Sequence, residues 1–167
     1  MILYVDTSAL VKLHVAETGS ARVRLWNDEA SGLVTSLVTY AEARAAFARL
    51  HRVGGLTTDA LRAVVTMFEH DWSRCQVIGL DDALVRRAGG LAERHGLRGY
   101  DAIQLATALE GRPRQGTLVF GCFDDRLNRA AVREGLVLPP EPDLVADRPR
   151  AVVARRRVQP RTGTRVT

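Results

Sequence analysis

Short apolar runs alternate with longer amphipathic segments along the first 138 residues of the chain. Ile2–Val5 is wholly apolar, which is typical of a strand buried on both faces of a parallel sheet. Four other short runs predict further strands, at residues 32–35, 75–79, 117–120 and 136–138. Between the runs, apolar positions recur at helical spacing and predict helices at residues 7–16, 20–30, 37–51, 58–72, 84–95, 100–110 and 125–134.

The alternation of strands and helices predicts the fold class. It indicates an α/β protein, a three-layer α/β/α sandwich with a central, mostly parallel sheet. Residues 1–138 are enough for one domain with a core of its own. Residues 139–167 hold five of the six prolines and a run of arginines without lasting periodicity. We therefore expect this segment to be a disordered C-terminal tail.

The basic charge of the chain is concentrated in that tail. The whole chain has a net charge of +5, but seven arginines and no acid follow Asp147. Residues 1–147 then carry 17 basic and 19 acidic groups, a net charge of −2. The domain is therefore not a basic nucleic-acid-binding module, and the total charge alone does not indicate RNA.

Several classes of protein are excluded by what the sequence lacks. It has no apolar run of about 18 residues, which predicts no membrane span, and Met1–Asp6 has no basic segment of the kind that begins a signal peptide. Cys75 and Cys122 lie far apart and suggest two buried thiols in a reducing cytoplasm. The four histidines fall at no metal-ligand spacing, and the glycine-rich phosphate-binding motifs are absent.

Four carboxylates stand where predicted strands end or predicted helices begin. Asp6 directly follows the first strand, and Asp124 follows the strand at 117–120. Glu42 and Asp101 lie near the starts of the helices at 37–51 and 100–110. Strand ends and helix starts share one edge of a parallel sheet, where ligands bind. We therefore expect the four acids to converge.

Each acid also has a purely structural explanation. Thr39-x-x-Glu42 matches a capping box, and the other three can cap helices. However, the apolar run before Asp6 is expected to bury it, and a buried carboxylate without a partner is costly. No Lys or Arg stands where it would obviously pair with Asp6 or Asp101. A hard cation with oxygen ligands, Mg²⁺ or Mn²⁺, would remove that cost, so the four acids together indicate a metal site.

Three segments around these acids resemble the PIN-domain proteins of the VapC toxin type. They are Val5-Asp-Thr-Ser-Ala-Leu-Val-Lys-Leu13, Gly99-Tyr-Asp-Ala-Ile-Gln-Leu-Ala-Thr-Ala-Leu109 and Phe123-Asp-Asp-Arg-Leu127. With Glu42 in its helix, the order and spacing match over about residues 1–138. The first two segments are the more specific, and the Glu42 and Asp124 segments are weaker taken alone.

The resemblance implies a function and a set of site residues. Asp6, Glu42, Asp101 and Asp124 would bind Mg²⁺ or Mn²⁺, and Thr7 or Ser8 would supply a supporting hydroxyl. Asp125 is an alternative fourth acid because it adjoins Asp124, although Asp124 keeps the family spacing. The implied protein is an endoribonuclease toxin and a homodimer, neutralised by a VapB-like antitoxin.

Basic side chains near the acids in sequence are candidates for holding RNA: Lys12, Arg44, Arg49, Arg98 and Arg126. Side chains of this kind are more often solvated surface charges. A phosphatase with an Asp-x-Asp-Thr motif would need an acid where Ser8 stands. A receiver domain would need a lysine late in the chain, and Lys12 is the only lysine. The alternative that remains is a catalytically silent interaction or RNA-binding module on the same fold.

Overall fold

Four short parallel strands form the centre of the structure, a computed structural model that describes residues 1–140. Their order in the sheet is β3-β2-β1-β4. The central strand β1 pairs with β2 on one side and with β4 on the other, so that Leu3 lies between Leu33 and Val119. The strands are β1 (Ile2–Val5), β2 (Gly32–Ser36), β3 (Gln76–Ile78) and β4 (Leu118–Gly121).

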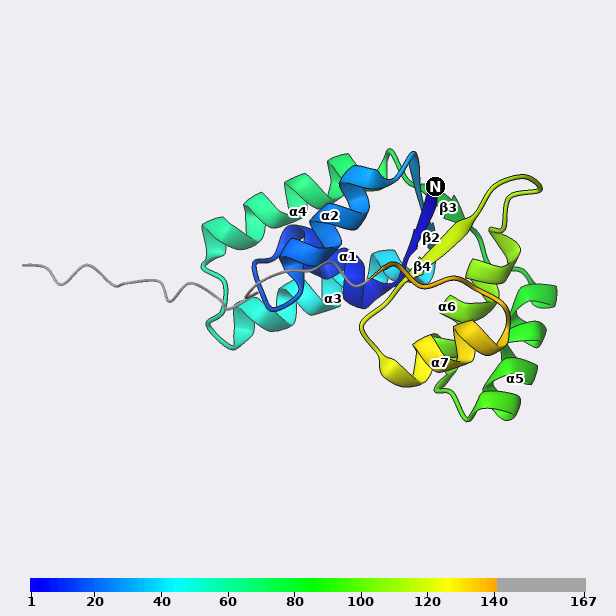
Figure 1. Ribbon diagram of the computed structural model, residues 1–167. Coiled ribbons are helices and arrows are strands. Elements are labelled where there is room, and N and C mark those ends of the chain that lie inside the picture. Colours follow the sequence, from blue (N-terminus) through cyan, green and yellow to red (C-terminus); the bar gives the residue numbers. More distant parts are fainter. Residues whose placement is uncertain (141–167) are drawn as a thin grey trace, which may run out of the picture.

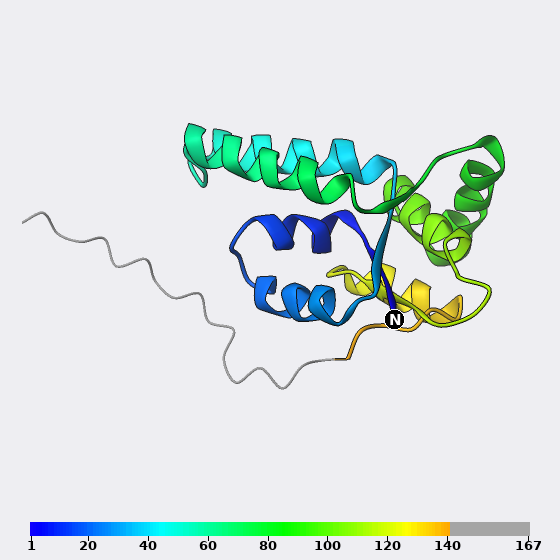
Figure 2. The same ribbon diagram turned by 90° about the horizontal axis from the view of Figure 1, so that it is seen from above.

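Helices cover both faces of this sheet (Figures 1 and 2). On one face lie α1 (Thr7–His14), α2 (Ser20–Glu29), α3 (Val38–Arg52) and α4 (Thr58–Trp72). On the other face lie α5 (Asp82–His95), α6 (Gly99–Glu110) and α7 (Asp125–Arg133). The predicted three-layer α/β/α sandwich is confirmed.

The residues of β1 explain why its sequence is apolar throughout. Leu3 and Val5 pack into the core beneath α1–α4, with Phe47. Tyr4 between them packs into the core beneath α5–α7, where its ring stacks on Phe120 with centroids 5.4 Å apart. Because successive side chains point to opposite faces, a strand covered on both sides buries every residue.

The last predicted strand is the main departure from the sequence expectation. Residues 136–138 form only one bridge, in which Val137 pairs with Val119 and its carbonyl accepts from the amide of Phe120 at 2.8 Å. Pro139 and Pro140 follow directly and have no N–H to continue a ladder.

The prediction of two buried thiols is right for Cys122 and wrong for Cys75, which is only partly buried.

Within residues 1–140 no helix is long and apolar enough to cross a membrane. The tail predicted at 139–167 lies, from residue 141 onward, outside the described residues.

The connections between strands create a crevice at one end of the sheet. The chain passes from β1 to β2 through α1 and α2 on one face, and from β3 to β4 through α5 and α6 on the other. The crossovers therefore change face between the neighbouring strands β1 and β4. In open parallel sheets, ligands bind at the carboxyl ends of the strands at such a switch point. Asp6 and Asp124 follow these two strands.

Candidate active site

Asp6 is buried at the end of β1, where it also caps α1. Its Oδ1 accepts hydrogen bonds from the amide of Ala9 (2.9 Å) and the hydroxyl of Ser8 (2.7 Å). Its Oδ2 accepts from the thiol of Cys122 at 3.1 Å. The side chain is only 6% exposed, and this burial, with a smaller contribution from the charge of Glu42, raises the pKa of Asp6 from 3.8 to about 6. The three hydrogen bonds lower the pKa but do not offset the burial.

Glu42 is held by residues of other elements rather than by its own helix. Its Oε2 accepts from the hydroxyl of Thr7 and from Nε2 of Gln104 at 3.0 Å. The same amide nitrogen lies 3.0 Å from Oγ1 of Thr39, and the Gln104 Oε1 accepts from Tyr4 at 2.7 Å. The capping-box explanation of Glu42 therefore fails, since no side chain caps the start of α3.

Arg98 links the other two acids. Its Nε donates to Oδ2 of Asp101 at 2.9 Å, and its Nη2 lies 3.7 Å from Oδ2 of Asp124. Asp124 also caps α7 by accepting from the amide of Leu127 at 2.9 Å. The expectation that no basic side chain pairs with Asp101 is wrong, because Arg98 precedes it by three residues at the start of α6 and the two side chains are neighbours there.

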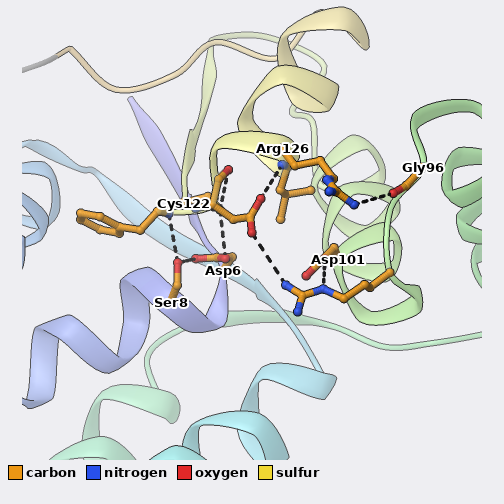
Figure 3. Close-up of polar contacts among 10 residues, drawn as sticks. Asp6, Ser8, Gly96, Asp101, Cys122 and Arg126 are labelled. Carbon is orange, nitrogen blue, oxygen red and sulfur yellow. Dashed lines mark hydrogen bonds and ion pairs between the residues drawn. The ribbon is translucent and has the colours of Figure 1, made fainter.

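All four predicted acids line one pocket of about 340 Å³. Figure 3 shows Ser8 beside Asp6 and Asp101 across from them on the neighbouring helix α6. The hydroxyls of Thr7 and Ser8 contact Glu42 and Asp6, so both supporting residues lie against the acids. The other polar side chains that line the pocket are Thr7, Ser8, Lys12, Glu17, Arg98 and Gln104.

The geometry distinguishes the two adjacent aspartates. Asp124 is partly buried and lines the pocket with the other three acids. Asp125 is exposed in the first turn of α7 and lines only a neighbouring pocket of about 600 Å³. This placement favours Asp124 as the fourth acid.

The five basic residues considered for RNA binding are placed differently. Lys12 and Arg98 line the acid pocket, where each forms an ion pair with an acid. Arg44 pairs with a glutamate of α4 at 2.8 Å, and Arg49 is exposed two turns beyond Glu42 on α3. Arg126 lines the neighbouring pocket of about 600 Å³.

Two residues of the site were given no role by sequence reasoning. Gln104 connects Tyr4, Thr7 and Glu42, and it lies three residues after Asp101 on α6. A buried glutamine within the apolar run Ala-Ile-Gln-Leu-Ala was the signal that could have revealed it. The thiol of Cys122 had no such signal; burial raises its pKa well above the ordinary value, so it remains a hydrogen-bond donor to Asp6.

The donor set of the pocket suits a hard divalent cation. The four predicted acids and the two hydroxyls offer oxygen ligands only, and the buried Asp6 has no cationic partner within residues 1–140. In the same part of the chain, no three His, Cys, Asp or Glu side chains lie close enough together to hold an ion as they stand. The Arg98 guanidinium lies against Asp101 and Asp124, and its side chain is 78% exposed, so it is free to move toward solvent.

Comparison with known proteins agrees with this fold. The PIN domain family model matches residues 3–133. The chain is 36% identical over 140 residues to Ribonuclease VapC45 of Mycobacterium tuberculosis, covering 83% of this chain and 95% of that protein. The chain therefore belongs to the PIN-domain family.

Two solved structures share the fold. One is the Mycobacterium tuberculosis VapC20, described as a sarcin-ricin loop cleaving toxin, with a TM-score of 0.59, 21% identity and coverage of 81% of this chain and 96% of that chain. The other is VapBC2 from Rickettsia felis, bound to a DNA fragment from their promoter, with a TM-score of 0.53, 17% identity and coverage of 83% and 98%.

The raised pKa of Asp6 predicts how the free energy of unfolding of the metal-free protein depends on pH. Because its pKa is raised on folding, the folded state holds a proton that the unfolded state loses, and the free energy of unfolding falls as pH rises from about 4 to about 6. Asp6→Asn keeps a capping oxygen and removes this penalty. We expect it to be more stable than the parent at pH 7 by on the order of 1–3 kcal/mol, and equal to it at pH 4.

Urea unfolding in excess chelator at both pH values measures this difference. Asp81→Asn is the matched control, because Asp81 caps α5 in the same way but is exposed. Asn and Asp are nearly equal as caps, so this control should lie within about 0.5 kcal/mol of the parent. A destabilised Asp6→Asn at pH 7 would show that the fold stabilises the charge of Asp6.

Proposed function

We propose that the protein is an endoribonuclease that depends on Mg²⁺ or Mn²⁺ and acts as the toxin of a toxin–antitoxin pair. The observation that carries this proposal is the convergence of Asp6, Glu42, Asp101 and Asp124 on one pocket at the switch point of the sheet. The 36% identity to a protein named as a ribonuclease supports RNA as the substrate.

The four acids would hold the metal, with Ser8 and Thr7 as positioning residues. When bound, the ion supplies a Lewis acid that activates water and shields the charge of the phosphodiester. Ser8 orients Asp6 by donating to Oδ1 while its oxygen accepts from the amide of Phe123 at 3.0 Å. Thr7 and Gln104 hold Glu42. No histidine lines the pocket, so a carboxylate is the group able to orient the attacking water.

The rival function is a catalytically silent interaction or RNA-binding module. Such a module has no need for a buried carboxylate with a raised pKa, which is a cost to the folded state that a metal site would explain. The presence of all four acids in one pocket therefore favours the enzyme. The cleavage assay described below separates the two functions.

The same proposal includes the partners and the compartment. A toxin of this type acts in the cytoplasm, forms a homodimer and is neutralised by a VapB-like antitoxin. The fold shared with VapBC2 of Rickettsia felis supports an antitoxin partner. Sedimentation of the purified chain measures the dimer directly.

We expect the purified protein to cleave single-stranded or loop RNA in Mg²⁺ or Mn²⁺ and to stop in excess chelator. Asp101→Asn should lower the cleavage rate by at least about 100-fold, the lower end of what a positioned catalytic group contributes. Asp82→Asn, an exposed acid in the first turn of α5, is the control and should cleave at the parent's rate. Cleavage that persists in chelator would exclude the metal-dependent mechanism.

Two neighbouring substitutions test whether Asp124 or Asp125 is the fourth acid of the site. Asp124→Asn should lose cleavage by at least about 100-fold, whereas Asp125→Asn should keep the parent's rate, because only Asp124 lines the acid pocket. Asn preserves the cap of α7 in the first variant, so both proteins should melt alike. The reverse order of activities would assign the role to Asp125.

Expression in a bacterial host tests the toxin assignment. The parent should arrest growth, and Asp6→Asn expressed at the same level should not. Co-expression of the protein encoded immediately upstream should restore growth. If the Asp6→Asn variant arrests growth as strongly as the parent, the arrest is not caused by the nuclease site.

A further inference from the structure

Helix α7 presents a row of arginines on its solvent-facing side. Arg126, Arg129 and Arg133 are exposed and recur at intervals of three and four residues, which places them on one face of the helix. The opposite face buries Leu127 and Ala130 in the core. The row runs from Arg126 to Arg133, about 10 Å along the helix axis.

Several other arginines on the helix surfaces are paired with carboxylates. Arg44, Arg86 and Arg87 each pair with a carboxylate at 2.6–2.8 Å. Within residues 1–140, Arg129 and Arg133 have no carboxylate within ion-pair distance.

Arg126, the third member of the row, and Glu134, which follows α7, add no ion pair to the row. Among the described residues, Arg126 donates to the carbonyl of Gly96 at 3.2 Å and to no carboxylate, and Figure 3 shows its side chain reaching that turn. Glu134 directly follows α7 but is already bound by Arg94 (2.9 Å) and His95 (2.6 Å). Asp125 adjoins Arg126 and stands four residues before Arg129, but within residues 1–140 none of the three arginines of the row forms an ion pair with a carboxylate.

The row lies along a groove made of three adjoining pockets, the first of which is the acid pocket. The acid pocket shares Arg98, Asp101 and Asp124 with the pocket of about 600 Å³. That pocket shares Arg126 and Arg129 with a third pocket of about 310 Å³, whose lining residues are His95, Gly96, Arg126, Arg129, Ala130 and Arg133. No acid lines the third pocket.

We propose that this groove binds the sugar–phosphate backbone of the RNA on one side of the cleaved bond, with Arg129 and Arg133 as phosphate contacts. The inference rests on the proposed nuclease function and adds the path of the substrate. Residues 1–147 have a net charge of −2, so a polyanion needs local cations to approach the four acids.

The chemistry of the groove favours RNA over an acidic peptide. Its inner end is lined by Asp101, Asp124 and Asp125, which repel carboxylates, whereas a metal bound there would attract a phosphodiester. A single strand of RNA that enters at the basic end and is cleaved at the acidic end fits the charges of both ends of the groove.

The test compares two double variants of the full chain that lose the same charge. Arg129→Gln with Arg133→Gln removes the two unpaired arginines of the row. Arg52→Gln with Arg62→Gln is the control, since both are exposed on α3 and α4, on the other face of the sheet. Binding of a labelled single-stranded RNA is measured by fluorescence anisotropy in chelator over a range of KCl concentrations.

We expect the α7 variant to bind more weakly and to flatten the plot of log affinity against log salt by about 1.4, or about 0.7 for each lost contact with a single strand. Its KM for cleavage should rise while kcat stays near the parent's value. The control should match the parent in both. Equal salt slopes for the two variants, with both proteins folded by circular dichroism, would overturn the proposal.

Two further outcomes separate this inference from the proposed function. If the parent cleaves no RNA in Mg²⁺ or Mn²⁺, the nuclease function fails, while the salt slopes still decide whether α7 binds RNA. If the α7 variant binds and cleaves RNA like the control but no longer binds the upstream-encoded antitoxin, the row is a protein interface and the RNA path is wrong.

Discussion

The burial of the Asp6 carboxylate is the constraint on which the site depends. The apolar strand β1 lies in the middle of a sheet covered on both faces. Asp6 follows this strand directly and is therefore buried, with only 6% of its surface exposed. Hydrogen bonds from Ser8, Ala9 and Cys122 hold its two oxygens, yet they do not offset the loss of hydration, and the pKa rises to about 6. A group held in this way is available to bind a cation.

Glu42 is held by a polar network that crosses the sheet. Gln104 on α6 joins Tyr4 of β1 to Glu42 of α3, although α3 and α6 cover opposite faces. The network passes beyond the carboxyl end of the sheet, where the strands no longer separate the layers. Each side chain in such a network restricts the conformations of the others. The position of Glu42 relative to Asp6 is therefore fixed by the packing of both layers.

Acidic and basic side chains divide the surface near the switch point. The acids gather where β1 and β4 end, and Arg98 neutralises two of them in the absence of metal. The unpaired arginines of α7 lie beside this pocket rather than within it. A nuclease has to attract a polyanion toward a cluster of negative charges, and separating the two functions along a groove meets both needs. The overall charge of the chain reveals none of this, because it is dominated by the arginines after Asp147.

The sequence by itself determined the alternation of strands and helices and the edge at which Asp6 and Asp124 lie. Both follow from local patterns, since an apolar run predicts a buried strand and the next residue stands at its end. Only the tertiary structure decided that Glu42 is bound by Gln104, 62 residues away, and Asp6 by Cys122, 116 residues away. It also showed Val137 in a single bridge instead of a strand and Arg98 within reach of Asp124. Such contacts depend on how separate elements pack and on which way a long side chain turns, and no local pattern of residues encodes either.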